Sequence, residues 1–365
     1  MTTRDLGSNS DGERQSARPK PRTTRRDPWR PRSRKTSTSR SASEAAGATR
    51  VRKPRLPSFD PGPEATVREI ADARGRYYDH AGAFTPFLAI ETAGGFFLLD
   101  TDDAHVGRSL FSKGSRGELR ILRRGLRILE EAGQAERARA GTFVDVGANI
   151  GTTTVAALYA NGFTRALALE PEPRNVRLLR INIAVNGFAD RVQLLQVAAS
   201  DALGTGHLRV FGDRWGLHEM VRAKGARAAR AKAARAEEVV EVELVTLDSL
   251  AARGLYDADG SGLLWIDTEG YEGHILAGAT RLLSKGTPTI LEVSPDKLEN
   301  QGGLGSLLDA ASANYTDFVD MRHVSGEPDS PRGISYEMKP IDRFPTLVDE
   351  YVALDHFTEV LLLRR

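Results

Sequence analysis

The sequence contains no cysteine and no long apolar segment. Without cysteine, a disulfide, a thiolate metal site and a cysteine nucleophile are all excluded. No stretch reaches the roughly 18 uncharged apolar residues of a membrane-spanning helix, and the N-terminus lacks the apolar core of a secretory signal. We therefore expect a soluble, cytoplasmic protein. The 365 residues are 40% apolar and 27% charged, an ordinary globular composition with room for two domains at most.

Acidic residues are scarce in the first 55 positions, although the whole chain has a formal net charge of only +2. Residues 1–55 hold 16 Lys or Arg against 5 Asp or Glu, so the remainder carries a net charge of −9. Large apolar residues are nearly absent there, and such a segment cannot offset the entropy lost on folding. We expect residues 1–60 to form a disordered basic tail, the only part suited to nucleic-acid phosphates. A second basic, Ala-rich segment, 222–236, predicts an insertion loop or a short exposed helix.

Residues 61–140 are predicted to form a small N-terminal cover. Two apolar runs, 84–90 and 95–100, are separated by a glycine pair, which predicts a β-hairpin. Leucines then recur at spacings of three and four on a charged segment, which predicts an amphipathic helix ending near Gly133. These leucines are Leu119, Leu122, Leu126 and Leu129.

From residue 141 to 365, short apolar runs alternate with helical patterns, as is typical of a parallel sheet flanked by helices. Their nearly continuous apolar character predicts strands that are buried on both faces. The expected strands are 142–148, 166–171, 192–200, 262–270 and 288–295. Two late runs, 318–321 and 358–365, can close the sheet edge. The last could run antiparallel, because no strong helical pattern separates it from its neighbour.

Ligands of such sheets bind outside the carboxyl ends of the strands. The first strand runs into a helix through FVDVGANIG at 143–151, in which Gly147 and Gly151 permit a tight turn close to a ligand. Asp145 and Asn149 supply polar groups beside that turn. Glu170 ends the second strand 19 residues beyond Gly151, where a carboxylate can accept hydrogen bonds from both hydroxyls of a ribose.

The glycine spacing helps to choose the cofactor. A nicotinamide or flavin site requires G-x-G-x-x-G, because a pyrophosphate must reach the helix N-terminus. Here an acid stands two residues before the first glycine; it would repel a pyrophosphate but could hold the cationic amino-acid end of S-adenosylmethionine. The simpler alternative is that the glycines only form a turn and Glu170 caps the next helix, which the prolines at 171 and 173 would begin. A nicotinamide-dependent oxidoreductase, and a non-catalytic Rossmann-like protein with a nucleic-acid-binding tail, remain alternatives.

Three blocks resemble the FkbM family of S-adenosylmethionine-dependent methyltransferases: FVDVGANIG (143–151), ALEPEPRNVRLLRINIAVNG (168–187) and IDTEGYEGHILAGATRLL (266–283). The resemblance extends from about residue 84 to the C-terminus. It implies a class I methyltransferase domain over 141–365, an α/β fold that is Rossmann-like. Its sheet would be seven-stranded and mostly parallel, with an antiparallel last strand and helices on both faces. It also implies methylation of hydroxyl oxygens on small molecules, natural products or saccharides.

The resemblance also implies roles for individual residues. Asp145, Gly147, Asn149 and Gly151 would line the methionine end of the cofactor, and Glu170 would bind the ribose. Asp201, just past the third strand, would meet the adenine, although a role as a turn residue suits it nearly as well. Family members commonly carry a lysine before the Ile-Asp pair and a valine after it, whereas this chain has Trp265 and Thr268. We expect the acceptor pocket to come from loops and from the cover, at about 60–141 and 204–240.

The fourth strand ends in WIDTEGYE, 265–272, which holds the best catalytic candidates. Asp267 and Glu269 are two residues apart and can face one side, and a carboxylate there can remove the proton of an attacking hydroxyl. Alternatively, Asp267 caps a helix or binds the methionine amino group, and Glu269 binds backbone N–H groups. Other candidate bases are His218, Tyr271, His274 and Glu292. No familiar ligand spacing supports a metal site, and none is expected.

Overall fold

The computed structural model describes residues 65–212, 215–221 and 237–365. The tail predicted at 1–60 and the basic insert predicted at 222–236 lie outside these residues. The boundaries drawn at 60 and 140 between tail, cover and catalytic domain stay predictions.

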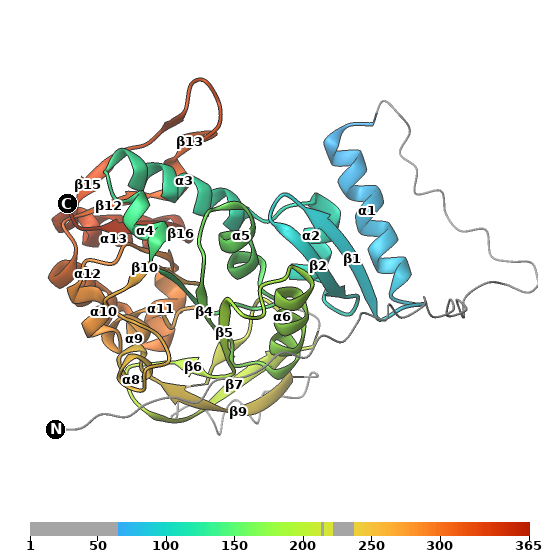
Figure 1. The fold of residues 1–365 in the computed structure, drawn as a ribbon, viewed down its shortest axis with the longest axis horizontal. Coiled ribbons are helices and arrows are strands. Elements are labelled where there is room, and N and C mark those ends of the chain that lie inside the picture. Colours follow the sequence, from blue (N-terminus) through green and yellow to red (C-terminus); the bar gives the residue numbers. More distant parts are fainter. Residues whose placement is uncertain (1–64, 213–214, 222–236) are drawn as a thin grey trace, which may run out of the picture. The chain divides into compact units, whose positions relative to one another are not determined.

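A mixed sheet of eight strands forms the centre of the fold (Figure 1). Its strands are β3 (Thr142–Val146), β4 (Ala166–Leu169), β5 (Val192–Leu195), β10 (Ser261–Ile266), β11 (Thr289–Val293), β12 (Asp317–Asp320), β15 (Met338–Pro340) and β16 (Thr358–Leu363). Their order is β15-β12-β16-β11-β10-β3-β4-β5. The five strands from β11 to β5 run parallel. Strand β16 is antiparallel to both β11 and β12, as predicted for the last strand.

Two predictions about the C-terminal part of the fold are wrong. The sheet has eight strands and not seven, because β15 pairs antiparallel with β12 and adds an outer edge. A helix, α13 (Phe344–Leu354), also precedes β16 where no strong helix was expected. Its buried residues lie at helical spacing, which is the signal that the sequence carries. They are Phe344, Leu347, Val348 and Tyr351.

Both faces of the sheet are buried, because neighbouring residues of each strand face opposite sides. Phe143 and Leu263 belong to one apolar core, whereas Val144 and Leu264 belong to the other. The first core is covered by α3 (Gly117–Glu131), α4 (Ala135–Ala140), α5 (Thr152–Ala160) and α6 (Pro173–Val185). The second is covered by α8 (Leu247–Ala252), α9 (Glu272–Ala277), α10 (Thr280–Ser284), α11 (Pro295–Gln301), α12 (Leu304–Asn314) and α13.

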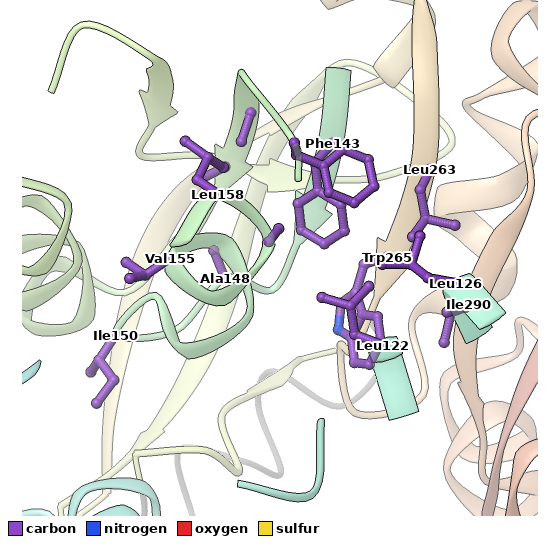
Figure 2. Packing of buried hydrophobic residues seen from close by; sticks show 14 of the residues in the cluster. Leu122, Leu126, Phe143, Ala148, Ile150, Val155, Leu158, Leu263, Trp265 and Ile290 are labelled. Atoms are coloured by element: carbon purple, nitrogen blue, oxygen red, sulfur yellow. The ribbon is translucent and has the colours of Figure 1, made fainter. Parts of the chain in front are cut away.

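The amphipathic helix predicted from the leucine spacing is α3, which lies directly on the sheet. Figure 2 shows Leu122 and Leu126 of this helix in the same core as Trp265 and Ile290. A Cβ atom on Gly125 would lie 2.6 Å from Cδ1 of Ile290, so glycine allows this close approach. No helix in the described ranges combines the length and apolar character needed to cross a membrane.

The predicted hairpin consists of β1 (Phe87–Thr92) and β2 (Gly95–Asp100), which pair antiparallel. Two helices that the sequence did not predict flank it in the chain, α1 (Val67–Ala81) and α2 (Val106–Lys113). The hairpin forms its own two-stranded sheet, so the outer edge of β2 has no strand partner.

Asn182 of α6 and Asn186, the residue that follows this helix, satisfy that outer edge. The side chain of Asn182 accepts from the backbone N–H of Leu98 at 2.7 Å and donates to the Leu98 carbonyl at 3.2 Å. Asn186, one turn later, makes the same pair of bonds with Phe96, at 2.9 and 2.6 Å. Asn182 also donates to the carbonyl of Ile150 at 2.9 Å. These amides replace a neighbouring strand and attach the hairpin to the loop that follows β3.

We expect Asn182→Ala to lower the free energy of unfolding by about 2–3 kcal/mol, because a fully buried side chain loses three hydrogen bonds and leaves backbone groups unpaired. Urea unfolding followed by circular dichroism measures the change. Asn314→Ala is the control, since Asn314 makes a single side-chain bond within α12. Equal losses in the two variants would contradict the attachment described above.

A second, four-stranded sheet follows β5 in the chain, with the order β6-β9-β7-β8. Its strands are β6 (Ala198–Ala199), β7 (Gly204–Phe211), β8 (Glu219–Met220) and β9 (Glu237–Val245). The strand predicted at 192–200 is therefore split between two sheets, as β5 and β6. Smaller elements are the strands β13 (Ser325–Gly326) and β14 (Ile334–Ser335) and the 3-10 turns Met321–His323 and Ile341–Arg343.

Candidate functional site

A cavity lies at the carboxyl ends of β3, β4 and β10, where ligands of open α/β sheets bind. It contains about 580 Å³ of space, part of which is open to solvent. Its polar wall includes Asn149, Glu170, His218, Asp267 and Glu269. Its apolar wall comes largely from the second sheet and adjoining loops: Val197, Ala198, Leu208, Trp215, Met220 and Ile275. We call it the first cavity.

Gly147 brings two loops of the first cavity together. Its φ is +83°, in the left-handed region that favours glycine. A Cβ atom at this position would lie 2.0 Å from the backbone oxygen of Asp267. The loop after β3 and the loop after β10 therefore touch, which places the glycine turn beside the predicted catalytic carboxylates.

Glu170 joins the loop after β3 to the loop after β4. One carboxylate oxygen accepts from the backbone N–H of Asn149 at 2.8 Å, and the other accepts from the backbone N–H of Glu172 at 2.9 Å. Burial raises the pKa of Glu170 to about 7. The helix cap of α6 is Glu172, whose carboxylate accepts from the backbone N–H of Asn175 at 2.7 Å. The alternative that Glu170 is that cap is therefore wrong, and its carboxylate faces the first cavity.

Two predicted residues of the glycine loop do not line the first cavity in the described structure. Asp145 is fully buried and accepts a hydrogen bond from the hydroxyl of Thr154 on α5, and its other oxygen has no partner among the described residues. Burial raises the pKa of Asp145 to about 7. Gly151 begins α5 with φ +94°, and a Cβ there would lie 2.5 Å from Cδ1 of Leu179. Gly151 thus allows α5 to pack on α6.

Asp201 lies outside the first cavity, at an exposed position. Its carboxylate lies 3.2 Å from Nδ1 of His274. Although partial burial opposes the change, hydrogen bonds from His274 and Ser200 hold the pKa of Asp201 below its usual range. The other ring nitrogen of His274 lies 3.0 Å from the carbonyl of Gln301. Because both nitrogens are in use, His274 is a poor candidate for the base.

Asp267 and Glu269 both line the first cavity, but their surroundings differ. Nζ of Lys297 lies 2.5 Å from Glu269 and 2.9 Å from Glu292, so both glutamates share one cation. No described residue donates a hydrogen bond to the carboxylate of Asp267. Burial, with the nearby charges of Glu292 and Glu269, raises the pKa of Asp267 well above its usual value. Of the two predicted catalytic residues, only Asp267 has a carboxylate without a hydrogen bond or an ion pair to a described residue; we call it the free carboxylate.

The loop that carries these residues is strained. Glu269 has φ +55°, which is uncommon for a residue with a side chain, and Gly270 follows with φ +94°. Glu272 stabilises the turn: its carboxylate accepts from the backbone N–H and the hydroxyl of Thr268, both at 3.0 Å. Burial raises the pKa of Glu272 to about 7. This turn points Glu269 toward Lys297, a residue that sequence reasoning did not single out.

His218 reaches the first cavity from the loop that directly precedes β8. The backbone N–H of Phe211 donates to its Nδ1 at 3.2 Å, so we place the ring proton on Nε2. Nε2 is buried without a partner among the described residues. Burial and the nearby charge of Arg174 lower the pKa of His218 to about 4. A neutral imidazole in this tautomer is a hydrogen-bond donor toward the cavity and not a base.

The fold and the site define the class of the protein. The architecture predicted for a methyltransferase is a parallel α/β sheet with one antiparallel strand, here β16 between β11 and β12, and a cavity at the carboxyl edge of the sheet. The chain is a methyltransferase. Residues 145–324 match the family described as the methyltransferase FkbM domain. Over these residues the match confirms the resemblance to the FkbM methyltransferases that the motifs predicted.

Among similar proteins is 2-O-methyltransferase NoeI of Sinorhizobium fredii, which is 28% identical over 173 residues, or 46% of this chain and 69% of NoeI. Methyltransferase FkbM from Methylobacillus flagellatus, solved as a crystal structure, is 16% identical in sequence to this chain, with a TM-score of 0.36. The match covers 61% of this chain and 44% of the Methylobacillus protein. TYW2 of M. jannaschii, solved in complex with AdoMet, is 12% identical with a TM-score of 0.33, over 77% of this chain and 87% of that one.

Proposed function

We propose that the protein transfers the methyl group of S-adenosylmethionine to a hydroxyl of a small molecule or saccharide. The observation that carries the proposal is the first cavity, in which the glycine turn, Glu170 and the free carboxylate of Asp267 meet. The name of the relative NoeI supports transfer to oxygen. A nicotinamide-dependent oxidoreductase is not favoured, since the loop lacks G-x-G-x-x-G and the family is that of methyltransferases.

The residues of the first cavity fit S-adenosylmethionine. The turn at Gly147 brings backbone close to a ligand, and Glu170 presents a buried carboxylate that can accept from ribose hydroxyls. The buried Nε2–H of His218 has no partner in the described chain and can donate to a polar atom of the cofactor. The apolar residues contributed by β6, β7 and β8 suit the faces of an adenine. Asp201 lies outside this wall, so we do not assign it to the adenine.

When bound, S-adenosylmethionine supplies an electrophilic methyl group. Asp267 would accept the proton of the acceptor hydroxyl as its oxygen attacks, because its carboxylate is free and its raised pKa makes it a better base. Lys297 holds Glu269 in place and keeps it from this role. We expect positioning of the two substrates to contribute more to the rate than the proton transfer.

Calorimetric titration of the protein with S-adenosylmethionine and with S-adenosylhomocysteine tests the proposal. We expect binding of both, and absence of binding at millimolar ligand would contradict the cofactor assignment. Glu170→Ala should weaken binding of S-adenosylmethionine by roughly tenfold to a hundredfold. The change removes a carboxylate acceptor and the hydrogen bonds that join the loop after β3 to the loop after β4. Glu136→Ala, at an exposed position of α4, is the control and should bind normally.

A further inference from the structure

A second cavity adjoins the first and shares part of its wall. Both are lined by Gly216, Asp267 and Glu269. The second cavity contains about 800 Å³ of space, part of it open to solvent. The residues that line only the second cavity and carry the inference are Arg116, Glu118, Trp265, Glu292, Lys297 and Glu359. Because a reacting hydroxyl must meet the methyl group near Asp267, the second cavity is where an acceptor can lie.

The sheet itself builds the floor of the second cavity. Trp265 and Ile290 pair across β10 and β11 and belong to the core beneath α3. Glu292 lies two residues after Ile290 and therefore on the same face. Glu359 of β16 is the direct antiparallel partner of Glu292. Two carboxylates at directly opposite positions of a sheet repel each other, so this arrangement needs compensation.

The described arginine and lysine side chains neutralise the charge of only some of the carboxylates that line the second cavity. Arg116 pairs with Glu118, and Lys297 pairs with Glu292 and Glu269. The carboxylate of Glu359 accepts from its own backbone N–H but has no ion pair or hydrogen bond with any other described residue. Burial, with the charges of Glu292 and Glu118, raises the pKa of Glu359 to about 7. The floor of the second cavity thus lacks one positive charge, at Glu359.

Trp265 supplies a hydrogen-bond donor to the second cavity. Its side chain is only 3% exposed, yet it lines the second cavity, and no described residue accepts a hydrogen bond from its indole N–H. This N–H is not one of the buried polar atoms without a partner, so it keeps access to solvent, and a ligand oxygen can accept from it in place of water. Phe357 adds a half-exposed ring to the same lining, with Nζ of Lys297 5.8 Å from its centroid. Aromatic rings with a few polar groups are typical of sites for small ring compounds.

We infer that the second cavity binds the acceptor, and that the acceptor is a small hydroxylated ring compound bearing a protonated amine, of the amino-sugar type. The inference rests on the proposed function and specifies its substrate. The ammonium group would lie against Glu359, and a ring or hydroxyl oxygen would accept from Trp265. Phosphorylated or carboxylated acceptors would be rejected, because five carboxylates face this cavity against Arg116 and Lys297.

In the reaction, the acceptor oxygen forms a bond to the methyl carbon while the bond from that carbon to sulfur breaks. The electron pair of the broken bond stays on sulfur, which gives S-adenosylhomocysteine. The hydroxyl proton passes to Asp267 and then to solvent. The amine is not methylated, because it is protonated and therefore has no free electron pair.

Methyl transfer from isotopically labelled S-adenosylmethionine to matched acceptors tests this inference. The panel is glucosamine, galactosamine and 2-deoxystreptamine, with glucose, galactose, N-acetylglucosamine and glucose 6-phosphate for comparison. We expect O-methylated products from at least one amine-bearing compound, with kcat/KM about tenfold or more above that of its neutral counterpart. The sugar phosphate should be the poorest acceptor. Equal use of neutral and amine-bearing acceptors, preference for the phosphate, or methylation on nitrogen would overturn the inference.

Two variants test whether Glu359 and Trp265 bind the acceptor as inferred. Glu359→Gln should remove the preference by lowering kcat/KM for the amine much more than kcat/KM for the neutral sugar. Trp265→Phe keeps a ring but removes the N–H, and should lower kcat/KM for all sugars by roughly five- to tenfold. Glu350→Gln, on the exposed face of α13, is the matched control. A preference for the amine that survives Glu359→Gln would also overturn the inference.

Failure of this inference can be told apart from failure of the proposed function. Calorimetric binding of S-adenosylmethionine without turnover of any amine-bearing acceptor overturns only the acceptor class. Absence of S-adenosylmethionine binding overturns the proposed function itself. Thermal unfolding of each variant shows whether a lost activity comes from a lost fold.

Discussion

Asp267→Asn is expected to lower kcat by about 10²- to 10⁴-fold while leaving the affinity for S-adenosylmethionine within a few-fold of the parent protein. The amide keeps the shape of the side chain but cannot take up the proton of the acceptor hydroxyl. Steady-state kinetics with labelled cofactor gives kcat, and calorimetry gives the affinity. Asp349→Asn, at an exposed position of α13, should leave both unchanged.

The pH dependence provides a second test of the same residue. Burial and two neighbouring glutamates, Glu292 and Glu269, raise the pKa of Asp267. The carboxylate is the active form, so kcat/KM should fall as the pH is lowered through this raised pKa. In Asp267→Asn this acidic limb should disappear. An unchanged limb, or activity within tenfold of the parent, would assign proton removal to another group or to water.

Gly147→Ala should nearly abolish cofactor binding and also destabilise the protein. The added Cβ atom would lie 2.0 Å from the backbone oxygen of Asp267, and the residue would keep an unfavourable φ of +83°. We expect the affinity for S-adenosylmethionine to fall by roughly 100-fold, because the loop must move by about an ångström. The free energy of unfolding should fall by about 3 kcal/mol or more.

Gly187→Ala separates the effect of the positive φ from the effect of the close contact with Asp267. Gly187 has a similar φ of +75°, but a Cβ atom there meets nothing within 4 Å. This variant should lose only about 1 kcal/mol of stability and bind the cofactor normally. Calorimetry and urea unfolding measure both variants. If the two alanine variants behave alike, the close approach of the loops is not what makes Gly147 necessary.

The parallel part of the sheet could be predicted because its strands are short, apolar and bounded by turns. The same signal predicted that Gly147, Asn149, Glu170, Asp267 and Glu269 would meet at one edge, and all five line the first cavity. That result follows from topology: every parallel strand ends on the same side, so residues at strand ends gather even when they are more than 100 positions apart.

The second sheet was missed because its strands are polar on one face. In β9, Val242 and Leu244 alternate with Glu241 and Glu243, a half-buried strand pattern that the neighbouring charges hide. His218 was named from the sequence only as a candidate base, and its role as a hydrogen-bond donor in the first cavity could not be predicted without this sheet. The ion pair of Lys297 with Glu269 could not be predicted either, since it depends on the left-handed turn at Glu269 and not on spacing in the sequence.

The asparagine pair at the C-terminal end of α6 also affects strand addition by other chains. A two-stranded hairpin normally leaves main-chain groups that can recruit a strand from a second molecule. Here Asn182 and Asn186 occupy those groups on β2. Intermolecular strand addition at this edge therefore requires both side chains to be displaced first. The same helix begins at Pro173, three residues after Glu170, whose carboxylate joins two loops of the first cavity, so α6 connects the hairpin to this cavity.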